Sequence, residues 1–245
     1  MAEVRYEYGL HEIDSVAQKL NFLTKKSHVF AFKGPIGAGK TTLIKLLLRF
    51  YDPTQGHILV DGKNLKDIDL SSWYQQLGTL FQDFARYDLS LKENIAVGNI
   101  HSHNQDAIEH ALSQADGKSI LLQMKSGWNQ RLGKWLEEGQ ELSVGQWQKV
   151  AIARALYRNA PILIMDEPTA NIDAEAEAEI FENLKKVYKN KSLVFISHRF
   201  STVRLADHIL VIDQGHLIEQ GSHKDLLKKD GLYAKYFNLQ KKGYE

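Results

Sequence analysis

The sequence predicts an α/β fold with a mainly parallel sheet, and three observations support this prediction. An apolar stretch, His28–Phe32, runs into the glycine-rich segment Gly34–Thr41, and a helical pattern follows. A second stretch, Pro161–Met165, is continuously apolar, as is typical of a strand buried on both faces of a parallel sheet. A helical pattern over Ala174–Tyr188 follows that strand, and this alternation of strand and helix is typical of α/β folds.

Length and composition indicate one ordinary globular domain. The 245 residues are 43% hydrophobic and 25% charged, and they contain no cysteine. The absence of cysteine excludes disulfides and thiolate catalysis. The net charge is +1, from 31 basic and 30 acidic side chains, so we expect no nucleic-acid partner. No apolar run approaches the roughly 18 residues of a membrane-spanning helix, and no secretory signal begins the sequence. We therefore expect a soluble domain.

Short strands and one helix are predicted in the first third of the chain. Val4–Tyr8 alternates like a strand, and Lys19–Leu23 is a further candidate. After the glycine-rich segment, residues 41–50 have helical spacing that ends before an Asp-Pro pair. His57–Asp61 and Leu77–Phe81 read as two more strands. The early strands predict an N-terminal antiparallel β-subdomain.

A helical insertion and a second α/β part complete the predicted fold. The insertion covers about residues 83–160: residues 92–125 are polar with helical apolar spacing, and a helix opens at Ser143 and runs to about Arg158. Two short helices are expected to close the chain. The remaining predicted strands are Leu193–Ser197, His208–Ile212 and His216–Glu219. We expect one domain over residues 1–245, with lobes rather than two domains.

The glycine-rich segment fits the phosphate-binding pattern GxxxxGK[ST]. Its glycines allow backbone N–H groups to approach phosphate oxygens closely, and the following helix adds the positive end of its dipole. Lys40 supplies a charge to the terminal phosphates, and Thr41 offers a hydroxyl ligand to Mg²⁺. The glycine order does not fit the dinucleotide pattern G-x-G-x-x-G. The predicted nucleotide-binding residues here are Gly34, Pro35, Ile36, Gly37, Ala38, Gly39, Lys40, Thr41 and Thr42.

Two acids follow the apolar strand Pro161–Met165. Open α/β sheets place ligand-binding groups at such strand ends. Asp166 is suited to hold the Mg²⁺ that bridges the phosphates, and Glu167 is suited to act as the general base on an attacking water. The alternative is a solvated acidic turn that caps the next helix. The four apolar residues before Asp166 favour the functional interpretation.

The pentapeptide LSVGQ, Leu142–Gln146, resembles the LSGGQ signature of the ATP-binding cassette (ABC) ATPases. Ser143 as a helix N-cap, with Gly145 in the first turn, would direct a hydroxyl, amides and the helix dipole at an anion. The signature precedes IMDEP at the spacing of the family. The resemblance implies that Ser143, Gly145 and Gln146 contact ATP held on a second cassette. Val144 stands where the family has its second signature glycine.

The resemblance implies roles for four more residues. Gln82 in TLFQDF is similar to the glutamine that contacts Mg²⁺ and the attacking water. Asp173 in ANID is similar to the D-loop aspartate at the dimer interface, and His198 in ISHR is similar to the switch histidine at the γ-phosphate. Tyr8 suits the aromatic residue that stacks on adenine, although Tyr6 shares its strand face.

Further segments resemble the exporter branch of the family, in which the cassette is fused behind a membrane domain. These are RFYDPTQGHILVDG, DLSLKENI and LGKWLEEGQELS, the last with Glu137 at an acid expected to contact the membrane domain. The resemblance implies hydrolysis of ATP with Mg²⁺ in a head-to-tail dimer. The implied partners are a second cassette and a membrane-spanning domain, fused or separate, at the cytoplasmic face of a membrane.

Two alternatives stay open at this point. A soluble ABC ATPase of DNA repair or translation usually carries a coiled-coil insertion or a second cassette, and the sequence contains neither. A degenerate regulatory cassette would bind ATP without turnover. Val144 is the only support for that alternative, whereas the presence of Glu167, Gln82 and His198 opposes it.

Overall fold

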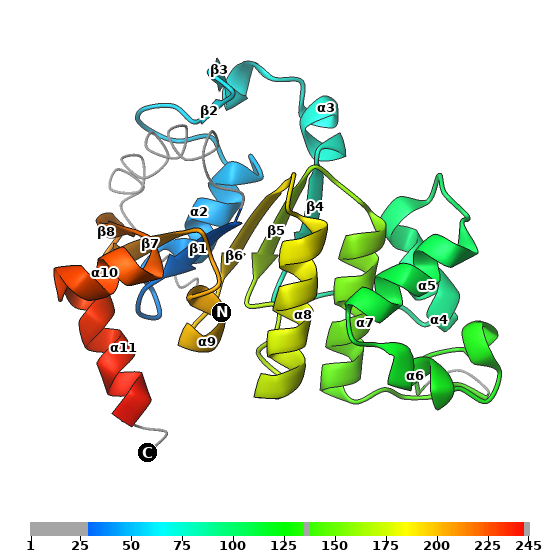
Figure 1. Cartoon of the computed structure of the whole chain (residues 1–245). Coiled ribbons are helices and arrows are strands. Elements are labelled where there is room, and N and C mark those ends of the chain that lie inside the picture. The colour runs from blue at the N-terminus through cyan, green and yellow to red at the C-terminus, as the bar shows by residue number, and fades with distance from the viewer. Residues whose placement is uncertain (1–28, 135–137, 243–245) are drawn as a thin grey trace, which may run out of the picture.

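The computed structural model describes residues 29–134 and 138–242, and its centre is a six-stranded sheet (Figure 1). The strand order is β4-β5-β6-β1-β7-β8, and every neighbouring pair is parallel except β7 with β8. The strands are β1 (Val29–Lys33), β4 (Leu77–Leu80), β5 (Ile162–Asp166), β6 (Ser192–Ile196), β7 (His208–Asp213) and β8 (His216–Gly221).

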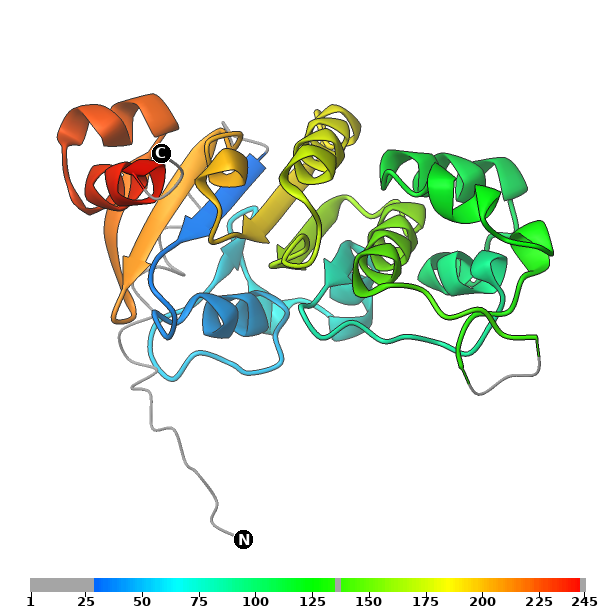
Figure 2. The same ribbon diagram turned by 90° about the horizontal axis from the view of Figure 1, so that it is seen from below.

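Helices cover both faces of this sheet (Figure 2). On one face lies α2 (Lys40–Leu47), with α3 (Leu70–Gln75) and a small antiparallel sheet nearby. The other face carries α7 (Val144–Tyr157), α8 (Ala174–Val187), α9 (Phe200–Val203), α10 (His223–Lys229) and α11 (Leu232–Lys242). The small sheet pairs β2 (Leu59–Val60) with β3 (Lys63–Asn64), and the 3-10 helix η2 (Leu65–Asp67) follows it.

The alternation of side chains along the strands creates two separate cores. In β1, Val29 and Ala31 join the core beneath α7 and α8, whereas Phe30 and Phe32 join the core against α2. Successive side chains of a strand point to opposite faces, so a strand covered on both sides is apolar throughout. The next residue, Lys33, is therefore directed to the same face as Ala31.

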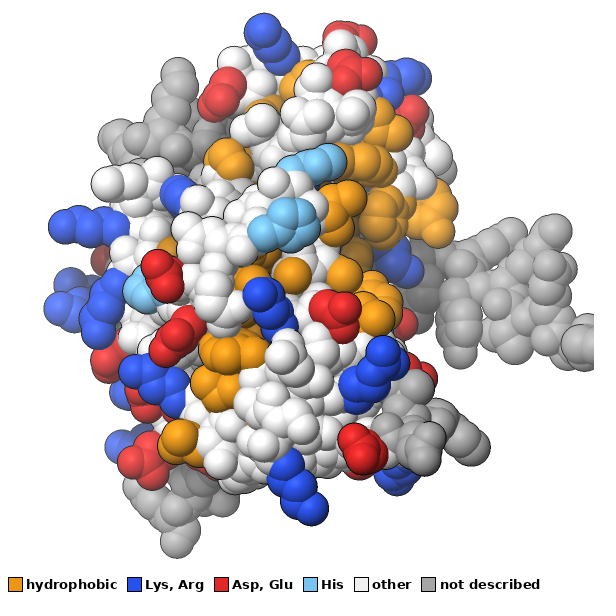
Figure 3. Space-filling model, turned by 90° about the vertical axis from the view of Figure 1, so that its right-hand side faces the viewer, with side chains coloured by type: hydrophobic (Ala, Val, Ile, Leu, Met, Phe, Trp, Pro, Cys, Tyr) orange, Lys and Arg blue, Asp and Glu red, His pale blue; other side chains and the backbone are white. Residues whose placement is uncertain are grey.

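A helical lobe extends from the β4 edge of the sheet (Figures 1 and 2). It contains α4 (Leu91–Ala96), α5 (Gln105–Gln114), α6 (Lys118–Leu122) and the 3-10 helices η3 (Val97–Asn99) and η4 (Gly127–Asn129). Arg154 of α7 fixes α4, because its guanidinium donates to the backbone oxygen of Asn94 at 2.8 Å and to Oδ1 of Asn94 at 3.1 Å. On the outer face of the lobe, hydrophobic side chains lie among charges of both signs (Figure 3).

The predicted fold class is confirmed, with four local differences. The helix predicted over residues 41–50 ends at Leu47, because Arg49 takes a left-handed backbone with φ 54°. The strand predicted at His57–Asp61 is only two residues long. Helices α3 and α9 were not predicted, since six and four residues are too few to show a helical period. Of the predicted antiparallel subdomain the structure describes β2 and β3, and the stretches Val4–Tyr8 and Lys19–Leu23 lie outside the described residues.

The helices are short compared with a lipid bilayer. Within residues 29–134 and 138–242, none is both long and apolar enough to cross a membrane.

Candidate functional site

The loops after four parallel strands meet at one edge of the sheet. The register aligns Ile196 of β6 with Phe32 of β1 on one side and with Asp166 of β5 on the other. It also aligns Leu80 of β4 with Met165. The segments that begin at Gly34, Gln82, Glu167 and Ser197 therefore emerge side by side, at the place where open α/β sheets bind ligands.

The glycine-rich loop between β1 and α2 depends on its glycines. A Cβ added at Gly34 would lie 1.9 Å from the backbone oxygen of Ile212, so no other residue fits against β7 there. Gly37 and Gly39 have φ of 83° and 90°, a left-handed backbone that glycine adopts without strain. Lys40 is only 6% exposed, and its Nζ donates to the backbone oxygens of Gly34 at 3.0 Å and of Pro35 at 2.7 Å.

Helix α2 offers amide donors and no competing negative charge at its start. Gly39 is its N-cap and has no side chain to accept from the first-turn amides, and the first turn is Lys40, Thr41 and Thr42. These amides and the helix dipole favour an anion in front of the helix. Burial lowers the pKa of Lys40, while the carboxylates of Glu167 and Asp166 act in the opposite direction. The loop therefore fits a phosphate chain in charge and shape.

Asp166 ends β5 as a buried carboxyl group. Burial raises its pKa, and the side-chain hydrogen bond with Thr41 opposes that rise. A buried carboxylate beside a hydroxyl and a lysine is a set of groups that suits a hard cation such as Mg²⁺. Gln82 is exposed and lies two residues after the end of β4, the strand that pairs with β5.

Glu167 and His198 are in direct side-chain contact at this edge of the sheet. His198 Nε2 lies 2.8 Å from Glu167 Oε1. Glu167 has φ 48°, a left-handed backbone that is uncommon outside glycine and is often found at functional sites. Its N–H donates to the backbone oxygen of Ile196 at 3.1 Å, which anchors the turn to β6. Burial lowers the pKa of His198, and Lys40 and Lys33 lower it further against the opposing effect of Glu167.

The signature segment begins α7 with a capping box. The N–H of Gln146 donates to Ser143 Oγ at 3.2 Å, and the N–H of Ser143 donates to Gln146 Oε1 at 2.9 Å. Gln146 Nε2 also donates to Gln123 Oε1 at 3.0 Å. A Cβ added at Gly145 would lie 2.9 Å from the backbone oxygen of Asn171, so the signature packs tightly against the segment 170–173.

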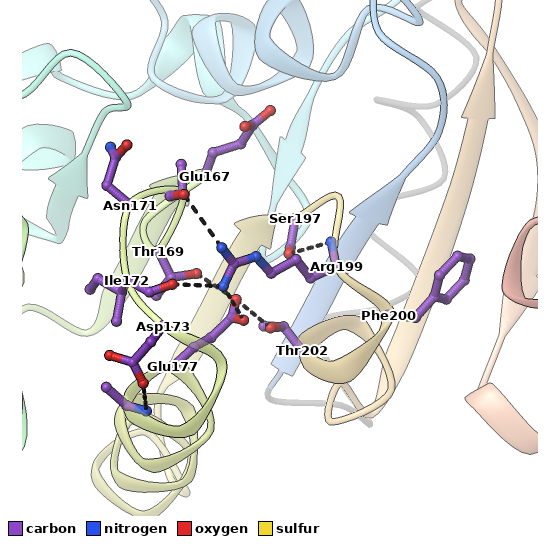
Figure 4. A network of polar contacts seen from close by, with 12 residues as sticks. Glu167, Thr169, Asn171, Ile172, Asp173, Glu177, Ser197, Arg199, Phe200 and Thr202 are labelled. Atoms are coloured by element: carbon purple, nitrogen blue, oxygen red, sulfur yellow. Dashed lines mark hydrogen bonds and ion pairs between the residues drawn. The ribbon is translucent and has the colours of Figure 1, made fainter. Parts of the chain in front are cut away.

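A buried carboxylate joins the segment 170–173 to the residues after β6 (Figure 4). Glu177 is 1% exposed. Its Oε2 accepts from Arg199 Nη1 at 2.8 Å, and its Oε1 accepts from the hydroxyls of Thr169 and Thr202 at 2.6 Å each. The same Nη1 donates to the backbone oxygen of Ile172 at 2.9 Å. Arg199 follows His198 directly, so this network ties the histidine segment to the start of α8.

The structure groups the predicted site residues into two sets. Gly34 to Thr42, Gln82, Asp166, Glu167 and His198 lie at the carboxyl edge of the sheet. Ser143, Gly145 and Gln146 lie at the start of α7, where their described contacts are with Asn171 and Gln123. Asp173 caps α8, with Oδ1 accepting from the N–H of Ala176 at 2.9 Å. Tyr8, Tyr6 and Glu137 lie outside the described residues.

Four residues of this region were not predicted from the sequence: Lys33, Gln148, Glu177 and Arg199. Gln148 is 2% exposed, and it accepts from the N–H of Asn171 at 3.1 Å and donates to the backbone oxygen of Glu167 at 3.4 Å. A polar residue within an apolar element was the available signal, since Lys33 ends an apolar strand and Gln148 lies among buried residues of α7. No preassembled metal cluster occurs in the described parts of the chain, where no group of three or more His, Asp or Glu side chains could hold an ion.

Comparison with known proteins gives consistent matches over most of the chain. Residues 17–170 match the family model described as ABC transporter. The chain is 40% identical over 232 residues to an ATP-dependent lipid A-core flippase of Alcanivorax borkumensis, covering 95% of this chain and 39% of the relative. It is 39% identical over 223 residues to the subtilin transport ATP-binding protein SpaT of Bacillus subtilis, covering 91% and 36% respectively.

Two further matches concern an exporter and a solved structure. The beta-(1→2)glucan export ATP-binding/permease protein NdvA of Bartonella henselae is 42% identical over 216 residues, with 88% of this chain and 36% of that protein covered. A solved structure of a bacterial Atm1-family ABC exporter with ATP bound superimposes with a TM-score of 0.80 at 39% identity, covering 87% of this chain and 36% of that one. The chain therefore spans less than half the length of these relatives.

Proposed function

The chain belongs to the ABC transporter family, and from that premise we propose that it is the nucleotide-binding domain of an exporter and that it hydrolyses MgATP. We further propose that residues 1–245 act as one domain, with the helical insertion at about residues 83–160. The relatives reported above are named as a flippase, a transport protein and exporters. None of them is named as a DNA-repair or translation protein, so they support the exporter alternative.

The observation that carries the proposal is the contact of Glu167 with His198 beside the N-terminus of α2. A γ-phosphate held by the loop amides and Lys40 would face both side chains. Glu167 would accept the proton of the attacking water, as a general base held in a fixed turn. The lowered pKa of His198 keeps its imidazole neutral, with a single N–H to donate. In the nucleotide-free chain Nε2 is directed at Glu167, and a bound γ-phosphate would accept this hydrogen bond in place of the carboxylate.

Mg²⁺ fits the residues present. Thr41, Asp166 and Gln82 would hold it, and the ion would neutralise charge on the phosphate oxygens. The buried Asp166 carboxyl, whose pKa is raised by desolvation, is in the environment that a bound cation would stabilise.

The proposed assembly places ATP between two copies of the cassette. Ser143, Gly145 and Gln146 have no described contact with the phosphate loop of their own chain, which supports a role at the nucleotide of a second cassette. We propose a head-to-tail dimer, attached to a membrane-spanning domain at the cytoplasmic face of a membrane. The relatives are more than twice as long as the stretch matched here, which supports such a domain.

Phosphate release by the purified chain tests this function. In a concentration series, specific activity should rise with protein concentration, because each site needs two chains, and Lys40→Ala should abolish it. Lys45→Ala is the matched control, because Lys45 lies on the same helix, five residues after Lys40. ATP binding without turnover at every concentration would favour the degenerate regulatory cassette. Stimulation by DNA or ribosomes would favour the soluble alternative.

A further inference from the structure

Lys33 is a buried cation that the proposed chemistry does not use. It ends β1, directly before the phosphate loop, and is 5% exposed. The other four residues of the strand are Val29, Phe30, Ala31 and Phe32, so a lysine interrupts an apolar pattern. Burial of a charged group without compensation is costly, so such a residue needs a partner.

The partners of Lys33 belong to the segment that carries His198. Lys33 Nζ donates to the backbone oxygen of His198. The same ammonium lies 4.0 Å from the centroid of the Phe200 ring, a distance at which a cation is attracted to an aromatic face. Within the described residues, Lys33 forms no salt bridge. Its contacts therefore hold residues 198–200, the switch segment, and not a carboxylate.

The switch segment is held on its other side by Arg199. That guanidinium reaches the backbone oxygen of Ile172 and the Glu177 carboxylate, on the α8 side of β6 (Figure 4). Lys33 holds the same segment from the β1 side. Two cations thus restrain His198 from neighbouring elements. The imidazole can point at Glu167 only while this backbone stays in place.

We propose that Lys33 is a positioning residue that holds the switch segment against β1, so that the His198 imidazole faces Glu167. The expected effect of Lys33 on turnover rests on the proposed ATPase function. Its expected effect on the position of the His198 ring does not. The charge of Lys33 matters for the contact, because an ammonium donates a stronger hydrogen bond than a neutral amine and only the charged form makes the cation–π contact.

The charge on Lys33 is sensitive to pH in an accessible range. Its pKa is lowered from the ordinary 10.5 to about 8, chiefly by burial and also by the charge of Lys40 on α2, against the opposing effect of Glu167 after β5. His198 after β6 is the other titratable group in contact. Its register partner Val211 on β7 and the Phe200 ring on α9 carry no charge. The anchoring contact should therefore weaken as pH passes about 8.

The test compares Lys33→Met, which keeps the length of the stem and removes the charge, with Lys33→Arg, which keeps the charge. Lys45→Met on α2 is the control lysine. The first measurement is the NMR signal of the His198 ring in the nucleotide-free chain, assigned with His198→Gln. The wild-type signal should shift with an apparent pKa near 8. Lys33→Met should lose that shift and raise the pKa of His198, since a nearby positive charge is removed.

The second measurement is steady-state ATP turnover across pH. Lys33→Met should lower kcat about tenfold or more at pH 7 through misplacement of His198, with ATP affinity unchanged within about threefold. The wild-type alkaline decrease near pH 8 should be absent in that variant, and Lys33→Arg should retain most of the rate.

The outcomes separate the two proposals. Wild-type protein that shows the His198 shift but no turnover would contradict the ATPase function and leave the positioning role intact. A His198 signal that is insensitive to pH near 8 in wild type, and unchanged in Lys33→Met, would overturn the positioning role whatever the rates. If Lys33→Met does not fold, the wild-type titration and Lys33→Arg still decide.

Discussion

His198 Nε2 lies 2.8 Å from Glu167 Oε1, and the two residues come from turns after neighbouring strands, β6 and β5. The contact depends on sheet register, because Asp166 aligns with Ile196 and each side chain follows shortly after. The left-handed backbone of Glu167 then turns its side chain toward the histidine. The proposed base is thus held by a hydrogen bond in the absence of substrate. Four predictions concern this contact and the residues around it.

Replacing the proposed base should separate binding from chemistry. Glu167→Gln keeps the shape of the side chain and removes its basicity, so phosphate release should fall about 100-fold to 10,000-fold while ATP still binds. Burst and steady-state phosphate assays, with ATP affinity measured separately, check this. Glu179→Gln, an exposed acid on α8, is the control and should keep the wild-type rate. A wild-type rate of turnover in Glu167→Gln would show that Glu167 is not the general base.

Two serine capping boxes occur in the described part of the chain, which allows a matched test of the signature. Ser143 caps α7 and Ser90 caps α4. Replacing either by alanine should lower the free energy of unfolding by about 1 kcal/mol, measured in urea. Only Ser143→Ala should also slow ATP turnover while leaving ATP binding to the monomer unchanged. Equal turnover in the two variants would argue against a shared site.

Removing Arg199 should be strongly destabilising. Arg199→Ala leaves the Glu177 carboxylate, 1% exposed, without its counter-charge, so we expect a loss of about 3 kcal/mol. The pair of half-buried Arg49 with exposed Asp52 supplies the contrast, and Asp52→Asn should cost less than about 1 kcal/mol. Chemical denaturation measures both. Similar small losses in the two variants would mean that the buried network contributes little to stability.

Lys33 should lower stability at neutral pH even though we propose that it supports turnover. Its folded pKa of about 8 lies below the ordinary 10.5, so between these values the unfolded chain binds more protons and stability rises with pH. Below pH 8 the folded chain bears the full cost of the buried charge. The free energy of unfolding of Lys33→Met at pH 7 should therefore be about 1–3 kcal/mol higher than that of the wild type.

That advantage should shrink as pH rises toward 10, where wild-type Lys33 is neutral when folded. Thermal unfolding of both proteins between pH 7 and 10 measures the difference. A constant difference would show that the folded lysine does not titrate in this range. A less stable Lys33→Met at pH 7 would show that the hydrogen bond to His198 outweighs the cost of burial.

Much of the fold was predictable because its signals are local. The apolar run before Asp166 and the glycines of the phosphate loop each indicate their structure within a few residues. Ser143 was predicted as an N-cap, and the structure shows its capping box. By contrast, the helix after Lys40 was predicted too long, since nothing in the residues near Arg49 signals its left-handed backbone.

The site was less predictable where it depends on contacts between distant residues. Glu177 reads as one of several acids along α8, and its burial follows only from the positions of Arg199 and Thr202. Lys33 is likewise meaningful only because β6 brings His198 beside β1. These relations join residues far apart in the chain, and no local pattern encodes them.

Gln148 has a consequence for how variants of this chain should be interpreted. Its side-chain amide bonds both the backbone of Asn171 and the backbone of Glu167, and its helix is capped by Ser143. A change at this glutamine would therefore disturb two places: the surface proposed to face the ATP bound by the partner cassette, and the Glu167 turn proposed to act in hydrolysis of the ATP bound by the same chain. In a mixed dimer with one altered chain, both nucleotide sites would therefore be impaired. The remaining activity would then be lower than expected from one intact site and one altered site.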